Sequence, residues 1–324
     1  MNLRSLSRWI TACAFALQAG AAFSQAYPSR YITIVLPLSA GSFIDIVARL
    51  IGAELSQRIG QPVVYDNKPG ASGNIGAAQV AKAPADGYTV LVAASNLAMA
   101  PSLTKNLPWD PAKSFTPVAL LFTAPMVLSI HPDVPARTLP ELIELAKKQP
   151  GKLNYATPGI ATPHHFGTEL LQQVTGMKLT HVPYKGVGGA VTDLVGGQVQ
   201  IGYLSLGNLL PHHKNGKVRI IATASDARLP QTPEVPTLRE LGFKNGEITA
   251  WVGMFLPGGT PVDVTARLRR EVAEVMKTPK VRAAMLEQNA VEGTPGTAEQ
   301  MASEYAADLA RWPGVAARIG IKPE

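Results

Sequence analysis

The sequence predicts an α/β protein built from two lobes, and three observations support this prediction. Short apolar runs typical of buried strands alternate with segments whose apolar residues recur at helical spacing. A unit of strand, glycine-containing loop and helix at 32–60 occurs again at 153–176. The chain has 324 residues, of which 46% are apolar and 16% charged, so it can form two medium-sized domains with substantial cores.

The first half of the chain reads as strand, helix and strand in succession. An apolar strand at 32–36 precedes a helix over 44–59, in which apolar residues recur every three or four positions and after which Gly60 provides a stop. Further short strands are predicted at 63–65 and 90–94. This βαβ order implies a largely parallel sheet.

The middle of the chain shows the same alternation. An amphipathic helix is predicted over 139–148, and a strand over 153–156 follows it. Thr162 then suits an N-cap, Pro163 the first helical position, and Gly176 the end of the next helix. Two more strands are predicted, at 199–203 and at 219–224.

The C-terminal third predicts helices. Pro261 opens a helix with one apolar face, and Thr297 with Gln300 has the spacing of a capping box for another. Pro313 is expected to end that last helix, because proline removes an amide donor from the helix interior.

The N-terminus has the organisation of a secretory signal peptide. Arg4 and Arg8 precede an apolar region at 10–23, and the small-x-small site 24–26 leaves Tyr27 as the first mature residue. We therefore expect cleavage of residues 1–26 and an extracytoplasmic, soluble product. A retained membrane anchor and a lipid-modified Cys13 are the alternatives. Cys13 is the only cysteine, so the mature chain is expected to have no disulfide.

The charge pattern argues against nucleic acid as a partner. Removal of the two N-terminal arginines lowers the formal charge from +7 to +5. The remaining cationic residues are scattered and form no basic stripe interleaved with aromatic residues.

Two helix starts are candidate anion sites. The small and flexible residues from Ser39 to Ser42 allow a ligand to approach the backbone, where a helix start offers N–H donors and a partial positive charge. Ser42 and Asp45 also have capping-box spacing, so this start could instead be satisfied by its own side chains, with Asp45 turned toward its own backbone.

The second helix start lies at Gly159–His165. Thr162 can cap the helix and meet a ligand, and His165 could donate to an anionic oxygen; an ordinary cap beside a surface histidine pair is the alternative. Ligands of open α/β sheets gather at the carboxyl ends of strands. One such start in each lobe favours a carboxylate-bearing ligand held across a shared cleft.

Other chemistries lack their usual residues. The glycines at 67–77 match neither GxGxxG nor a Walker loop and predict a structural turn into a helix. His165 and Glu169 share one helix face, but the chain contains no HExxH motif, so no metal is expected. Ser205 is not in a G-x-S-x-G elbow, and no carboxylate pair accompanies either loop, so we expect no catalytic residue and no cofactor.

Taken together, several short segments make the mature chain resemble the Bug family, the extracytoplasmic solute-binding receptors of tripartite tricarboxylate transporters. Each segment is short, but their order and spacing are specific. They are YPSRYITIVLPLSAG (27–41), DNKPGASGNIGA (66–77), ADGYTVL (85–91), PGKLNYATPG (150–159), HVPYKG (181–186), GGQVQ (196–200), VPTLRELG (235–242), WVGMFLPGGTP (251–261) and GIKPE (320–324).

The resemblance implies a type II periplasmic-binding-protein fold, in which two α/β domains joined by crossing hinge strands close over a small ligand. Domain 1 would comprise 27–124 and 226–324, and domain 2 would comprise 125–225. It also implies a periplasmic location, a monomer, a small carboxylate ligand, and a membrane permease of the tripartite tricarboxylate transporter type as partner.

In the family, carboxylate groups are held by the loop after the first strand and by the helix start of the second domain, partly through ordered waters. Here these segments match 38–45 and 157–165. Ser95, after the third strand, and the end of the strand at 199–203 complete the expected site. The expected ligand-binding residues are Leu38, Ser39, Ala40, Gly41, Ser42, Phe43, Asp45, Ser95, Thr157, Gly159, Ile160, Ala161, Thr162, His165, Leu204 and Ser205.

The chain departs from the family pattern at positions that affect the ligand. Phe43 and Ile44 stand where a small or hydroxyl residue is usual and are expected to narrow the first loop. Ala161 replaces a usual glycine, and Leu204 stands where an aspartate is often found. Because that carboxylate is missing, recognition of an ammonium group is not expected.

We therefore predict a periplasmic receptor for a carboxylate with an apolar or aromatic body. A periplasmic enzyme on the same scaffold with His165 as acid or base, and a receptor that feeds a sensor protein, are the alternatives.

Overall fold

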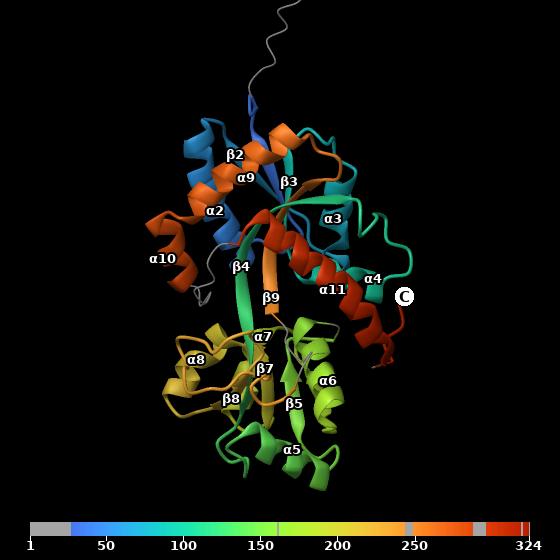
Figure 1. Ribbon diagram of the computed structural model, residues 1–324, viewed down its shortest axis with the longest axis vertical. Helices are drawn as coiled ribbons and strands as arrows, with labels where there is room; N and C mark the ends of the chain where they lie inside the picture. The colour runs from blue at the N-terminus through green and yellow to red at the C-terminus, as the bar shows by residue number, and fades with distance from the viewer. Residues whose placement is uncertain (1–26, 161, 244–248, 288–295, 319, 324) are drawn as a thin grey trace, which may run out of the picture.

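Two long strands connect the two lobes of the molecule (Figure 1). The computed structural model describes residues 27–160, 162–243, 249–287, 296–318 and 320–323. β4 (Phe115–Ile130) passes from one lobe into the other, and β9 (Thr249–Pro257) pairs antiparallel with its first part. Residues 115–125 of β4 pair with β9, whereas residues 126–130 pair with strands of the second lobe. The predicted two-lobed α/β class is confirmed.

The first lobe is built on a mostly parallel sheet. β1 (Ile32–Leu36) pairs in parallel with β2 (Val63–Asn67) and with β3 (Thr89–Ala94), and β9 pairs antiparallel with β3. Both faces are covered by helices and carry buried aliphatic residues, as a parallel sheet requires. The helices of this lobe are α2 (Phe43–Ile59), the 3₁₀ turn η1 (Ala71–Gly73), α3 (Asn74–Ala81), α4 (Asn96–Leu103), α9 (Val262–Met276), α10 (Pro279–Glu287) and α11 (Ala298–Arg318).

The second lobe has a smaller sheet of the same kind. β5 (Asn154–Thr157) pairs in parallel with β6 (Thr180–Pro183) and β7 (Ile201–Ser205). The end of β4 runs antiparallel to β7 and to β8 (Arg219–Thr223). The helices of this lobe are α5 (Leu139–Lys148), α6 (Pro163–Thr175), α7 (Val187–Val195) and α8 (Leu206–Lys214).

The core is continuous between the lobes. α11 of the first lobe reaches α6 of the second, where the rings of Trp312 and Phe166 meet edge to face with centroids 5.6 Å apart. The chain after β8 stays with the second lobe, since Thr237 forms a parallel bridge with Thr223. The proposed domain boundaries stay a prediction, but this bridge favours a second boundary later than 225.

Most helix ends lie where the sequence places them. Gly60 follows α2 in the left-handed conformation, with φ of 68°. Thr162 caps α6 through the amide of His165. Thr297 and Gln300 form the predicted reciprocal capping box, in which each side chain accepts from the other's amide. The 67–77 segment is the predicted turn into a helix.

Two predictions of element bounds are wrong. Pro313 does not end α11, which continues to Arg318. Trp312 and Val315 on either side are both 1% exposed, and their burial offsets the roughly 3 kcal/mol that an interior proline costs a helix. The strand predicted at 199–203 lies at 201–205, so Leu204 and Ser205 belong to β7 itself. Among the described helices, none is long and apolar enough to cross a bilayer.

Candidate ligand-binding site

The carboxyl ends of the parallel strands in both lobes point toward the place where the lobes meet. In the first lobe, Ala94 at the end of β3 pairs with Val252 of β9, which is opposite Phe122 of β4. In the second lobe, Ser205 at the end of β7 pairs with Met126 of β4. The two strand edges thus face each other across residues 122–126 of one continuous strand.

The separation of the two edges follows from the strand register. The amide of Ser95 donates to Trp251, which pairs with Thr123, whereas Ser205 pairs with Met126. Three residues of extended strand span roughly 10 Å. The two strand edges are therefore roughly 10 Å apart along β4.

The first-lobe loop is organised by Asp45. Its carboxylate accepts from the amide of Gly41 at 2.8 Å, from Arg49 Nε at 3.0 Å and from Asn67 Nδ2 at 3.0 Å. The Asn67 amide also donates to the Leu38 carbonyl, so both sides of the loop are held from β2. The alternative in which Asp45 turns toward its own backbone is therefore the observed one.

The charge of Asp45 is compensated locally. Hydrogen bonding from Arg49, opposed by burial and assisted by Asn67 and Gly41, lowers the pKa of the Asp45 carboxyl from 3.8 to about 2. Its ion pair with Arg49 cancels the negative charge in the first turn of α2. The helix start therefore keeps its attraction for an anion despite the acidic residue beside it.

Other first-lobe residues frame the same strand edge. Ser39, Ala40 and Gly41 are exposed, while Leu38 and Ser42 are half-buried. Ser42 caps α2 by accepting from the Asp45 amide at 3.3 Å. Gly41 has φ of 78°, a conformation that favours glycine, so the turn requires this residue.

The remaining first-lobe expectations concern Ser95 and two apolar residues. Ser95 is 2% exposed at the start of α4. Ile44 packs partly buried against the first-lobe core. The side chain of Phe43 lies outside the described residues, so its predicted effect on the loop stays a prediction.

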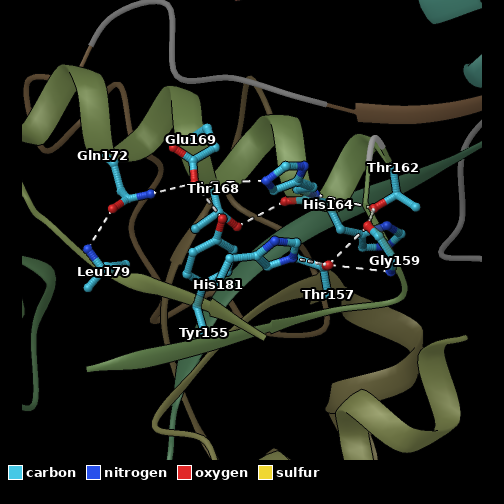
Figure 2. Close-up of polar contacts among 11 residues, drawn as sticks. Tyr155, Thr157, Gly159, Thr162, His164, Thr168, Glu169, Gln172, Leu179 and His181 are labelled. Atoms are coloured by element: carbon cyan, nitrogen blue, oxygen red, sulfur yellow. Dashed lines mark hydrogen bonds and ion pairs between the residues drawn. The ribbon is translucent and has the colours of Figure 1, made fainter. Parts of the chain in front are cut away.

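The second-lobe loop is held by hydroxyl groups. Thr162 Oγ1 donates to the Gly159 carbonyl at 2.8 Å and accepts from the His165 amide at 3.3 Å. Thr157 Oγ1 lies 3.1 Å from the same carbonyl and 2.7 Å from His181 Nε2 (Figure 2). The Thr157 side chain therefore supports the loop from behind.

Beneath this loop, three rings form a column. His181 stacks on Tyr155 with centroids 4.8 Å apart and on His165 with centroids 4.1 Å apart. The Tyr155 hydroxyl donates to Glu169, which also accepts from Gln172 (Figure 2). α6 is thus fixed to β5 and β6 directly below its first turn.

Burial lowers the pKa of the three histidines around this loop, His164, His165 and His181. Burial, with a smaller effect of His165, lowers the pKa of His181 to about 4, and burial also lowers the pKa of His165. Burial lowers the pKa of His164 to about 4, and its Nδ1 is sealed from solvent without a partner among the described residues. Any attraction for an anion at this helix start therefore comes from amide groups and not from a charged histidine.

The remaining expected residues of the second lobe are Leu204, Ala161, Ile160 and Ser205. Leu204 is fully buried among the core residues Val127, Ala190 and Leu194, so its side chain does not line the strand edge. Ala161 lies outside the described residues. Ile160 is 67% exposed at the tip of the loop. Ser205 is half-buried at the start of α8, with Oγ 3.8 Å from Met126 Sδ.

The sequence reasoning missed the residues that stand behind the loops. Asn67, Tyr155 and His181 were not expected at the site, and only the pairing of β2 with β1 and of β6 with β5 brings them there. The available signal was that all three residues lie in segments that carry the family resemblance, 66–77, 150–159 and 181–186. Within the described ranges, no group of three or more potential metal ligands comes together.

Comparison with known proteins identifies the family of this chain. Residues 47–321 match the family model described as the tripartite tricarboxylate transporter family receptor. The chain belongs to this family. It is similar to protein BugT of Bordetella pertussis, with 34% identity over 300 residues that cover 91% of each chain.

Two solved structures provide structural counterparts. Rpa4515 of R. palustris, solved with adipate, is 34% identical with a TM-score of 0.75, and the match covers 92% of this chain and 100% of that one. MatC of Rhodopseudomonas palustris, solved with bound malate, is 33% identical with a TM-score of 0.72 over 90% of this chain and 100% of that one. Periplasmic binding protein BugD is 33% identical with a TM-score of 0.72 over 92% of this chain and 100% of that one, so the periplasmic-binding-protein fold expected from the sequence is confirmed.

Proposed function

We propose that this receptor captures a small organic carboxylate between its two strand edges and delivers it to a membrane permease. The observation that carries the proposal is the register along β4. β1 pairs with β3 and β5 pairs with β7, so the loops before α2 and α6 follow strands that belong to the two edges meeting at residues 122–126 of β4. Each loop ends at a helix start, and such starts attract anionic oxygens.

The proposed contacts come from both loops. In the first lobe they are the exposed backbone of Ser39, Ala40 and Gly41 with Ser42 and Ser95. In the second they are Gly159, Ile160 and Thr162 with His165 and Ser205. Asp45 and Thr157 support the loops, because their polar atoms are occupied by neighbouring groups. Leu204 is not carried into the proposed contacts.

The body of the ligand is proposed to be apolar or aromatic. The exposed Ile160 offers apolar surface at the tip of the second-lobe loop, and the proposed contacts include no acidic side chain that could meet an ammonium group. The structures solved with adipate and with malate give two probes that differ in this respect, since adipate has the longer apolar body. We expect adipate or an aromatic acid to bind more tightly than malate.

Isothermal titration of the mature chain against adipate, malate, benzoate and aspartate tests the proposal. Thr162→Val is expected to weaken binding by roughly tenfold, since the Gly159 carbonyl loses one of its hydroxyl donors, whereas Thr162→Ser keeps the hydroxyl. Native mass spectrometry of the freshly purified protein would reveal a bound acid directly. Exclusive binding of aspartate would contradict the apolar body, and no binding of any carboxylate would contradict the function.

We further propose that residues 1–26 direct the chain to the periplasm and that the receptor has no catalytic activity. Ligand recovered chemically unchanged after long incubation with the protein supports a receptor. Conversion of the ligand would instead favour an enzyme.

A further inference from the structure

The second lobe carries most of the excess positive charge of the chain. Residues 125–225 contain nine Lys and Arg against five Asp and Glu, an excess of +4, whereas residues 27–124 and 226–324 together carry +1. Within the part of the chain that the structure describes, the ion pairs of residues 125–225 involve only histidines, so none of the nine cationic side chains meets a carboxylate. In the rest of the described chain most cationic side chains do, as Arg30 does with Asp86.

Six of the nine are lysines gathered at one end of the lobe. β5, β6 and β7 are parallel, so their amino ends lie at the edge of the sheet that faces away from the first lobe, and α5 lies at this far end of the molecule (Figure 1). The ends of α5 and α8 and the turns that lead into β5, β6 and β8 carry six exposed side chains, which we call the lysine end: Lys147, Lys148, Lys152, Lys178, Lys214 and Lys217.

Backbone contacts join the segments of the lysine end. The amide of Gly151 donates to the Lys178 carbonyl at 2.8 Å, which joins the turn after α5 to the turn before β6. The amide of Lys217 donates to the His212 carbonyl at 2.9 Å and folds the turn after α8 back onto that helix. The strand order β8, β4, β7, β5, β6 places the starts of β8 and β6 four strand spacings apart, which is roughly 20 Å.

Helix termini explain only half of these lysines. Lys147, Lys148 and Lys214 lie in the last turns of α5 and α8, where a cation complements the helix dipole. The other three lie in turns, where no helix terminus favours them.

The acidic residues at this end do not neutralise it. Asp133, Glu141 and Glu144 are exposed there, but the Glu141 carboxylate accepts from the amide of Arg137 at 2.7 Å. The Arg137 side chain is itself exposed, and Arg219 Nη1 donates to the Ala136 carbonyl and not to a carboxylate. Both arginines therefore add to the positive charge of the lysine end.

The composition of the lysine end indicates the kind of partner. The large apolar side chains that are exposed in the described chain lie elsewhere, and Ile160, the one among them in the second lobe, is in the loop at the opposite edge of the sheet. The core of a protein interface is enriched in aromatic residues and depleted in lysine. Lysine presents a flexible point charge that needs no fixed partner geometry, which suits a fluid layer of phosphate groups.

We propose that the lysine end binds the anionic headgroup surface of a phospholipid bilayer. Each Lys or Arg close to such a surface contributes to the attraction, which acts over about one Debye length. Along β4, Met126 at the strand edge that faces the first lobe and Ile130 at the lysine end are four residues apart, roughly 13 Å. A receptor held in this way keeps the space between its lobes open while it stays near a membrane permease.

Sedimentation with vesicles tests the proposal. The mature chain is expected to sediment with vesicles of equal parts phosphatidylglycerol and phosphatidylcholine and to stay in solution with phosphatidylcholine alone. Binding should disappear when the salt concentration rises from about 0.1 M to about 1 M, because the Debye length falls from about 10 Å to about 3 Å. No preference for the anionic vesicles would overturn the proposal, as would binding to a soluble glutamate polymer in place of the vesicles, which would assign the surface to an acidic protein.

Two variants of equal net charge locate the binding surface. The first replaces Lys147, Lys148, Lys152 and Lys178 by glutamine. The control makes the same change at exposed lysines outside residues 125–225 that pair with no carboxylate in the described chain: Lys82, Lys105, Lys113 and Lys322. The first variant is expected to need about tenfold more anionic lipid or more for half-maximal binding, and the control to stay close to the unaltered protein. Equal losses in the two variants would mean that only net charge matters and would overturn the proposal.

A fluorescent label gives the orientation without removing any charge. The mature chain contains no cysteine, so Gln149→Cys and Ala112→Cys each provide one labelling site, at the lysine end and in the first lobe. A quencher on the lipid headgroups is expected to quench the label at 149 and to leave the label at 112 bright. The reverse pattern, or equal quenching, would refute the orientation.

This inference does not depend on the proposed carboxylate ligand. The four lysines of the first variant lie away from the proposed contacts, so its Kd for adipate in titration calorimetry should equal that of the unaltered chain. Adipate binding without vesicle binding refutes the inference alone, whereas vesicle binding by a protein that binds no carboxylate refutes the proposed function alone.

Discussion

Replacement of Asp45 by asparagine tests how the first-lobe loop is held. The Asp45 side chain is 3% exposed and accepts from Gly41, Arg49 and Asn67. Asparagine has nearly the same shape but no charge, and its amide nitrogen would face the donors of Arg49 or Asn67. The substitution therefore removes the charge-assisted bonds while it leaves the volume unchanged.

The magnitude follows from the carboxyl pKa. Bonding from Arg49 lowers it from 3.8 to about 2, and a difference of one pKa unit corresponds to about 1.4 kcal/mol of differential interaction, so the folded state gains about 2.5 kcal/mol from the ionised form. Because Arg49 is 43% exposed, solvent reduces this value, and we expect Asp45→Asn to lower the free energy of unfolding by about 1–2 kcal/mol at pH 7.

The pH dependence has a definite sign. The folded-state pKa of Asp45 is depressed, so the stabilisation is complete above the unfolded value of 3.8 and disappears as the pH falls toward 2. Urea unfolding of the mature chain, followed by circular dichroism at pH 7, 5, 4 and 3, measures the difference between unaltered protein and variant. That difference should shrink only below about pH 4. A constant difference from pH 7 to pH 3 would refute the role of the charge.

Three further predictions concern other parts of the chain. Asp308→Ala should lower the free energy of unfolding by roughly 2–4 kcal/mol, because it leaves the buried indole of Trp251 without its acceptor at 2.8 Å; a loss below 1 kcal/mol in urea titrations would contradict this. Gly41→Ala should cost about 1–2 kcal/mol from backbone strain at φ of 78°, since no atom lies within 4 Å of the added methyl, and an unchanged melting temperature would argue against the strain. His164→Leu should lose less stability than the unaltered protein between pH 7 and 4.5. Burial lowers the pKa of the His164 imidazole from 6.5 to about 4, so below pH 6.5 the unfolded chain binds a proton that the folded chain does not. The free energy of unfolding of the unaltered protein therefore falls as the pH falls through this range. Equal losses of stability in both proteins would refute this role of His164.

Much of the secondary structure around the candidate site could be predicted from the sequence, because it depends on residues that are adjacent in the chain. The strand at 32–36, the cap Ser42, the cap Thr162 and the stop Gly60 each depend on a few adjacent residues, and the structure has all of them. Pro313 shows the limit of such reasoning. Its local cost is real, but buried neighbours on the same helix outweigh it, and burial is a property of the folded molecule.

The same limit explains which site residues escaped prediction. His181 meets Thr157 only because β6 pairs with β5, and Asn67 meets Asp45 only because β2 pairs with β1. Leu204 was expected at the site because it directly follows the strand predicted at 199–203. A shift of the strand by two positions and the alternation of faces send its side chain into the core instead.

By itself, the sequence determined the α/β class, the family and the two helix starts, because caps, turns and apolar spacing act over a few residues. Only the tertiary structure decided that both strand edges face residues 122–126, that Asp45 supports its loop, and that Thr157 meets His181 behind the second loop. These depend on strand register and on hydrogen bonds between segments distant along the chain, which no local pattern specifies.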